Sequence, residues 1–158
     1  MTWRGTTTPS DRIFASLPYL LVLFHALPFR ASVLTVFPAL SVVLEPLLLP
    51  LLLIYTIPFA GLVIFLGLFL LVVRNERISH FVRFNTMQAL LLTIVLFLAQ
   101  LILGLLPNVE VFGLMVRVFN STIFLGVLGI FVYAVVQSMR GLYTELPTIS
   151  EAVYSQVR

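Results

Sequence analysis

Residues 74–88 read Arg-Asn-Glu-Arg-Ile-Ser-His-Phe-Val-Arg-Phe-Asn-Thr-Met-Gln, and they form a polar hinge between two runs of almost pure hydrocarbon. One run covers residues 58–73 and the other covers residues 89–106. Two apolar segments joined by a short charged loop are typical of a membrane hairpin, and arginines beside membrane spans stay preferentially on the cytoplasmic side. Because the hinge carries three of the nine basic residues, we take it as the inner side and count the remaining topology outward from it.

The composition indicates an integral membrane protein. The chain has 158 residues, of which 61% are hydrophobic and only 9% are charged, whereas a soluble domain needs about 25% charged residues. Membrane spans must pair all of their backbone polar groups internally, so a chain of this type is predicted to be all-α. The net charge of +3 comes from arginine without any lysine, and it indicates orientation in the bilayer, not binding to nucleic acid.

Four spans are predicted, near residues 13–29, 58–73, 84–106 and 116–139, within a single membrane domain covering residues 1–158. The first has about 17 residues, close to the lower limit for crossing the hydrocarbon core. Both termini then lie on the inner side, and only Arg30 and Arg117 lie on the outer side. The arginines predicted on the inner side are Arg4, Arg12, Arg74, Arg77, Arg83, Arg140 and Arg158.

The very apolar residues 30–57 are interrupted by Pro38, Pro46, Pro50 and Glu45. A further crossing here would place the arginine hinge outside, so we expect a proline-broken segment on the outer side that is interfacial or re-entrant. Residues 140–158 are expected to form an inner tail with a short helix on the membrane surface. The predicted fold is therefore a four-helix membrane bundle with an extra outer segment.

Polar and small residues form a narrow stripe along the fourth span. On a 3.6-residue helix they share one arc, and small residues there let another helix approach closely. The third span has a looser polar counterpart in Asn85, Gln88, Thr93 and Gln100, and the two faces are expected to pack on each other. A polar groove or a surface for a partner helix stays open as the alternative. The stripe comprises Thr122, Gly126, Gly129, Tyr133, Gln137 and Arg140.

The sequence offers little for chemistry. It has no cysteine and only two histidines, and no Ser/His/Asp set, metal-binding motif or glycine-rich phosphate loop can be assembled. We therefore expect no enzyme, no catalytic residue, no cofactor and no metal site. Arg77, His80 and Arg83 recur at three-residue spacing and are predicted to form a basic strip against anionic lipid.

Several motifs resemble one known family. They are the opening Trp-Arg-Gly-Thr-Thr-Thr-Pro-Ser-Asp-Arg-Ile at residues 3–13, Leu-Phe-Leu-Leu-Val-Val-Arg-Asn at 68–75, Ile-Ser-His-Phe-Val-Arg-Phe-Asn-Thr-Met-Gln-Ala at 78–89, and Ser-Met-Arg-Gly-Leu-Tyr-Thr-Glu-Leu-Pro-Thr-Ile-Ser-Glu-Ala-Val-Tyr at 138–154. Together they resemble the twenty-kilodalton subunit of the chloroplast inner-envelope protein translocon, the Tic complex. With its short polar start, the chain is more similar to cyanobacterial or plastid-encoded members than to nuclear-encoded plant ones.

The resemblance implies a four-span channel or core component that helps move precursor proteins across a membrane, without enzymatic activity or a cofactor. It implies location in the plastid inner envelope or a cyanobacterial membrane, with both termini on the stromal or cytoplasmic side. Arg140, Gly141 and Tyr143 belong to the matching motif after the fourth span. The candidate contact residues of the hinge are Arg74, Asn75, Arg77, His80, Arg83, Phe84, Asn85 and Gln88.

Three functions are weighed on this basis. A translocon subunit would contact lipid, other subunits, precursor polypeptides and, in a homo-oligomer, further copies of the chain. A membrane scaffold or assembly factor would use the same faces to hold a fixed partner helix. A small-solute carrier is the least favoured, because intramembrane Gln88, Gln100 and Gln137 are its only support.

Overall fold

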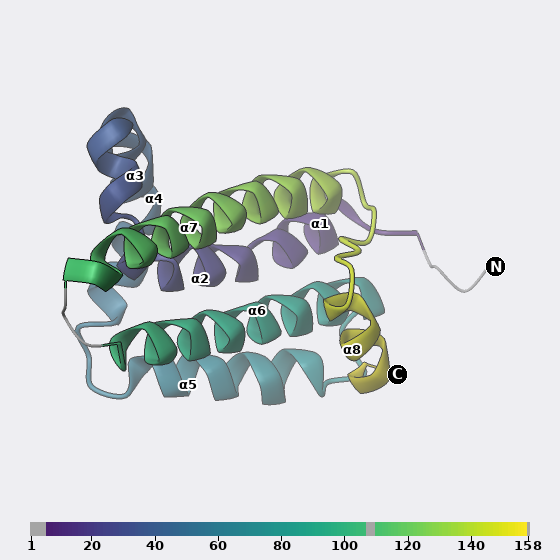
Figure 1. Ribbon diagram of the computed structural model, residues 1–158. Helices are drawn as coiled ribbons and strands as arrows, with labels where there is room; N and C mark the ends of the chain where they lie inside the picture. The colour runs from purple at the N-terminus through teal and green to yellow at the C-terminus, as the bar shows by residue number, and fades with distance from the viewer. Residues whose placement is uncertain (1–5, 107–109, 158) are drawn as a thin grey trace.

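The computed structural model describes residues 6–106 and 110–157, and every regular element in these ranges is helical (Figure 1). The predicted all-α class is confirmed. Within the described ranges, α6 (His80–Gly104) and the Gly113–Met139 part of α7 (Glu110–Met139) are long and apolar enough to cross a membrane. Arg4 and Arg158, which the sequence places on the inner side, lie outside the described residues.

The predicted first span consists of two short helices placed end to end, α1 (Pro9–Ser16) and α2 (Pro18–His25). Proline lacks an N–H and is tolerated at a helix start, and Leu17 keeps helical angles at the junction. The helix also begins earlier than the predicted span, because Thr8 and Asp11 form a reciprocal capping box. Both helices contact α6 and α7, so they lie between the two long helices in the packing.

The predicted outer segment is helical, and it breaks at only one of the three expected prolines, Pro38. After a short turn (η1, Leu27–Phe29) come α3 (Ala31–Val36) and α4 (Ala39–Ile54), and α4 runs through Pro46 and Pro50. These prolines lie on the exposed side of α4, whereas Leu44 and Leu48 are buried. The chain breaks at Phe37 instead, since a residue before proline avoids helical angles. Figure 1 shows α3 and α4 at the end of the molecule opposite the chain termini.

The predicted hairpin is built from α5 (Ala60–Gly67), η2 (Leu68–Val73) and α6. η2 is a π-helical continuation of α5, closed by a 3.0 Å bond from the Arg74 N–H to the Phe69 carbonyl. Ser79 caps α6 by accepting the Val82 N–H at 3.4 Å. The polar hinge therefore divides into a short loop, residues 74–79, and the first turns of α6.

The expected contact between the fourth-span stripe and the third span is not formed. α7 packs on α1, α2, α3 and η1, and its buried residues are Phe124, Val127, Ala134 and Ser138. These include larger apolar side chains than the stripe offers, so their burial removes more apolar surface from water. Gly126 and Gly129 face outward, and a Cβ at either position would meet no atom within 4 Å.

α7 ends in a glycine-dependent cap that contacts the N-terminal part of the described chain. Gly141 has φ +73°, and the N–H groups of Gly141 and Leu142 donate to the carbonyls of Ser138 and Gln137, both at 2.9 Å. This is the Schellman arrangement, in which glycine takes the left-handed position. A Cβ on Gly141 would collide with the Thr7 hydroxyl and lie 3.1 Å from Arg12 Nε. The segment before α1 therefore rests directly on the end of α7.

We expect Gly141→Ala to destabilise the protein. A non-glycine residue in the left-handed region costs about 1–2 kcal/mol, and the added methyl also displaces Thr7. Thermal unfolding of the purified protein in detergent measures the effect as a lowered Tm. Gly126→Ala is the matched control, because its Cβ enters open space and alanine favours a helix by up to about 1 kcal/mol over glycine. An equal fall in Tm for both variants would contradict the assignment.

Candidate functional site

Segments far apart in the sequence meet at one end of the molecule, which we call the terminal end. The Ser79 hydroxyl donates to Asp11 Oδ1 at 3.1 Å, Arg12 Nη1 donates to the Met139 carbonyl at 3.4 Å, and His80 Nε2 lies 3.3 Å from the Val157 carbonyl oxygen. Partial burial acts to raise the pKa of the Asp11 carboxyl, but hydrogen bonds from Thr8 and Ser79 outweigh it, so this pKa is lowered. The segments predicted on one side of the membrane therefore gather at one end (Figure 1).

A buried chain of hydrogen bonds runs through this end and is centred on Gln88. Asn85 and Gln88 are one turn apart on α6, so their side chains project from the same face. Gln88 Nε2 donates to the Tyr19 hydroxyl at 3.0 Å, and that hydroxyl donates to Asn85 Oδ1 at 3.1 Å. Asn85 Nδ2 in turn donates to the Phe81 carbonyl at 2.9 Å. All three side chains are fully buried, so each needs the partners it has.

The same chain of hydrogen bonds continues into the C-terminal segment. The Ser150 hydroxyl donates to Gln88 Oε1 at 3.2 Å and accepts the Leu146 N–H at 2.6 Å. Ser150 lies at the start of α8 (Ile149–Gln156), and Thr144 is buried just before it. Gln88 thus uses both ends of its amide, one toward α2 and one toward α8.

Aromatic side chains cover this hydrogen-bond chain at the terminal end. The Phe84 ring is fully buried between Tyr143, with centroids 5.1 Å apart, and Tyr154, with centroids 4.7 Å apart. His80 Nδ1 lies 3.0 Å from the Tyr143 hydroxyl. α8 is therefore packed onto α6, with Val153 and Val157 buried. The expected surface helix exists, but it is docked on the protein, because its apolar residues find this aromatic surface.

The structure divides the hinge residues predicted as contacts into two groups. His80, Phe84 and Gln88 form the docking site for the C-terminal segment, whereas Asn85 is bonded to Tyr19 and to the Phe81 carbonyl. Arg83 is tied to the hinge by a 2.9 Å bond from its Nε to the Val73 carbonyl, and Asn75 Oδ1 accepts the Arg77 N–H at 3.1 Å. The side chains of Arg74 and Arg77 are exposed.

The predicted stripe on α7 does not join this hydrogen-bond chain. Gln137 Nε2 donates to the Tyr133 hydroxyl at 3.3 Å, within the stripe itself. The remaining stripe residues are exposed, namely Thr122, Gly126, Gly129 and Arg140. Its role as a contact face therefore stays a prediction.

Sequence reasoning missed Tyr19, Thr144 and Ser150. Tyr19 lies in an otherwise apolar predicted span, and a single buried tyrosine needs a partner for its hydroxyl, which is the signal that was available. Ile149, Val153 and Val157 recur on one helical face, and this pattern could have shown that the tail has a surface to bury.

The arrangement is suited to positioning one segment of the chain against another. Its members are neutral amides and hydroxyls that satisfy one another in low-dielectric surroundings. Among the described residues, no three His, Cys, Asp or Glu side chains come together in a way that could hold a metal ion. The hydrogen-bond chain fixes the C-terminal segment against α2 and α6.

Comparison with known proteins adds the family. The family model described as chloroplast import apparatus Tic20-like matches residues 7–153. The chain belongs to the Tic20 family. It is 42% identical over 159 residues to the Tic20 family protein of Synechocystis, covering 100% of this chain and 99% of that protein.

Plastid members of the Tic20 family are more distant in sequence. Protein TIC 20-v, chloroplastic, of Arabidopsis thaliana is 33% identical over 94% of this chain and 71% of its own length. Tic20 family protein Ycf60 of Pyropia yezoensis is 34% identical over 96% of this chain and 77% of its own length. The predicted resemblance is confirmed, and the matched residues include Tyr19, Asn85, Gln88 and Ser150.

We expect Gln88→Leu to destabilise this Tic20-family chain by about 1–3 kcal/mol, because the buried hydroxyls of Tyr19 and Ser150 each lose one hydrogen bond. The measurement is thermal unfolding in detergent, combined with limited proteolysis of the C-terminal segment, which should become faster. Ser150→Ala added to Gln88→Leu should cost less than the two separate effects combined, since the residues are coupled.

Gln100→Leu provides the control on the same helix. The Gln100 side chain is exposed, so this substitution should change the free energy of unfolding by no more than about 0.5 kcal/mol. Additive effects of the Gln88 and Ser150 substitutions would show that the hydrogen bond does not link α8 to α6.

Proposed function

We propose that the chain is a membrane subunit of a protein translocon. The observation that carries this proposal is the match to the Tic20-like import family, which extends over residues 7–153. Because the match covers residues 7–153, the proposal does not rest on one shared motif. The proposal includes no enzymatic activity and no cofactor.

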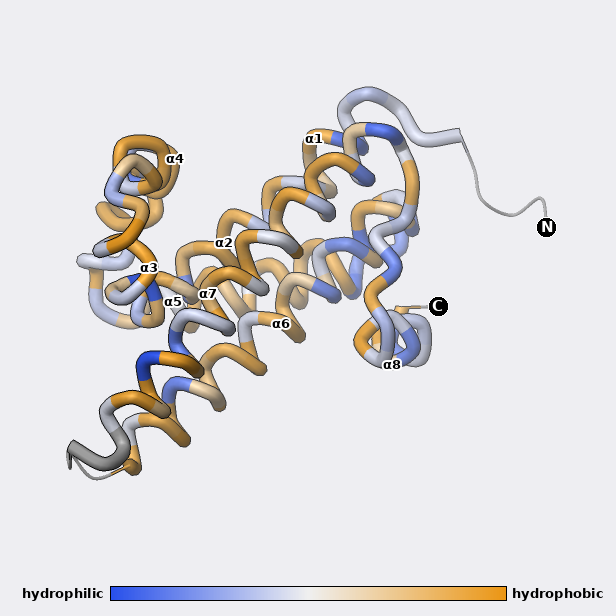
Figure 2. Tube along the Cα trace, turned by 45° about the horizontal axis from the view of Figure 1, so that its top comes forward, coloured by the Kyte–Doolittle hydropathy of each residue, from blue (hydrophilic) through white to orange (hydrophobic). Residues whose placement is uncertain are grey.

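In this proposal four helical segments cross the bilayer. The long helices α6 and α7 are two of them. The other two are α1 with α2 and α5 with η2, because these pairs run beside the long helices (Figure 1). Figure 2 shows apolar residues along these segments. Many large apolar side chains are exposed, such as Leu71 at 70% and Ile102 at 62%. Lipid covers such a surface without the unfavourable free energy of contact between apolar side chains and water. The terminal end then faces the stroma or cytoplasm.

The absence of cysteine makes this topology testable with single substitutions. We expect Glu76→Cys and Ser155→Cys to react with a membrane-impermeant maleimide from the inner side, and Thr35→Cys to react only from the outer side. All three residues are exposed. Labelling of intact and of opened vesicles measures the side. Labelling of position 35 and position 76 from the same side would contradict the four-span arrangement.

For transport, the exposed stripe of α7 is the proposed contact face. Gly126 and Gly129 leave room for a second backbone, and small residues are what close helix contacts in membranes use. Among the described residues, the helices of one chain pack around apolar core clusters. A conduit for precursor polypeptides would therefore be shared with other translocon subunits or with copies of this chain.

Site-specific photocrosslinking tests this contact. A photoreactive residue at Tyr133 should give adducts to many polypeptides while protein synthesis or import is active, and these should disappear when it is blocked. Leu71, exposed on η2, is the control position and should give few such adducts. Equal adduct patterns at both positions would contradict a specific substrate contact.

A membrane scaffold is the second candidate function. The exposed small-residue stripe of α7 suits a fixed partner helix as well as it suits a passing polypeptide. In that case Tyr133 would give one constant adduct that persists when synthesis is blocked. The solute-carrier hypothesis is less well supported, because the Gln88 side chain is buried and hydrogen-bonded to Tyr19 and Ser150.

A further inference from the structure

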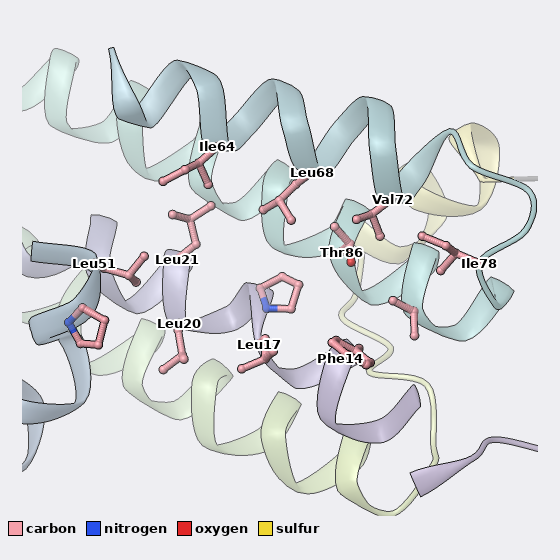
Figure 3. Close-up of a pocket in the computed structure, with 13 residues that line it drawn as sticks. Phe14, Leu17, Leu20, Leu21, Leu51, Ile64, Leu68, Val72, Ile78 and Thr86 are labelled. Carbon is pink, nitrogen blue, oxygen red and sulfur yellow. The ribbon is translucent and has the colours of Figure 1, made fainter. Parts of the chain in front are cut away.

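A long apolar groove opens between α1–α2 and α5–η2, with α6 as its floor (Figure 3). Phe14 and Leu17 line one wall, and Ile64, Leu68 and Val72 line the other. The cavity has a volume of about 640 Å³. The groove is longer than a local gap between two side chains, because its residues Ile64, Leu68 and Val72 extend over more than one helical turn.

The floor of the groove carries one unsatisfied polar group. Thr86 is fully buried, and its hydroxyl finds no hydrogen-bond partner in the described part of the chain. Figure 3 shows Thr86 between Val72 and Phe14. Because buried hydroxyls are normally paired, an occupant with a hydrogen-bond acceptor at this depth would complete the site.

The lining of the groove indicates an apolar occupant. Apart from Thr86, every residue that lines it is apolar. A hydrocarbon chain suits such walls, because it has no polar group that would need a partner along them.

A polar basin adjoins the groove at the terminal end. Ile78 lines both the groove and this basin, whose volume is about 600 Å³. The basin is lined by Arg77 and Arg83, and among the described residues that line it Glu76 supplies the one carboxylate. Ser79, His80 and Tyr154 add further polar side chains. Guanidinium groups bind phosphate through paired, charge-assisted hydrogen bonds.

We propose that this pair of cavities binds one anionic diacyl phospholipid, with an acyl chain in the groove and the headgroup phosphate beside Arg77 and Arg83. The ester carbonyl follows the headgroup and can accept a hydrogen bond from the Thr86 hydroxyl. Basic pockets between membrane helices on the inner side are suited to anionic headgroups. The inference rests on the proposed membrane placement, and it assigns to the basic strip a single bound lipid.

Fluorescence quenching by brominated lipids tests the site in the full-length chain. Trp3 is the only tryptophan, so Trp3→Phe gives a silent background. In it, Phe14→Trp places a reporter in the groove with little change in volume. Leu71→Trp is the matched control, since Leu71 precedes the groove residue Val72 but does not line the groove. Each protein is reconstituted in phosphatidylcholine with brominated phosphatidylglycerol or brominated phosphatidylcholine.

At Phe14→Trp we expect phosphatidylglycerol to be preferred over phosphatidylcholine about fivefold, the contribution of one arginine near anionic lipid. Adding Arg77→Gln should remove most of this preference, whereas Arg74→Gln should leave it, because Arg74 does not line the basin. Leu71→Trp should show no preference.

Two results would overturn the site. One is an equal lipid preference at the two reporters. The other is a Phe14→Trp reporter that neither lipid quenches, which would mean that the groove is closed to lipid or filled by polypeptide. Absence of quenching at Leu71→Trp would instead overturn the membrane placement, so the two failures are distinguishable.

Discussion

The structure depends on the amide of Gln88. In an interior without water, this side chain must satisfy a donor and an acceptor, and it does so with groups from two different parts of the chain, Tyr19 and Ser150. One requirement of physical chemistry therefore fixes both the position of α2 and that of α8 on α6. The aromatic cover of Phe84, Tyr143 and Tyr154 then closes the terminal end around these hydrogen bonds.

This constraint also explains why the polar hinge has two functions. His80, Phe84 and Gln88 hold the C-terminal segment. The exposed arginines, Arg74 and Arg77, stay available to the membrane surface. Because the two groups follow each other within one short stretch, a change in one of them alters the placement of the other.

The sequence predicted those features that arise from local pattern. Hydropathy located the hairpin of α5, η2 and α6 and the long helix α7, and the polar stretch at residues 74–88 located the terminal end. It failed where packing decides between equivalent faces. The stripe on α7 has the composition of an internal contact, yet Phe124 and Val127 provide the buried face. Similarly, Pro46 and Pro50 read as breaks, but their exposed position lets α4 continue.

The placement of α1 and α2 between the two long helices bears on how the protein assembles during synthesis. This segment leaves the ribosome first and contacts both α6 and α7. When each later long helix enters the bilayer, the surface on which it packs is already there. The hydrogen bond from Ser150 to Gln88 can form only after α6 and α7 have been made, so α8 docks on helices that precede it in the chain.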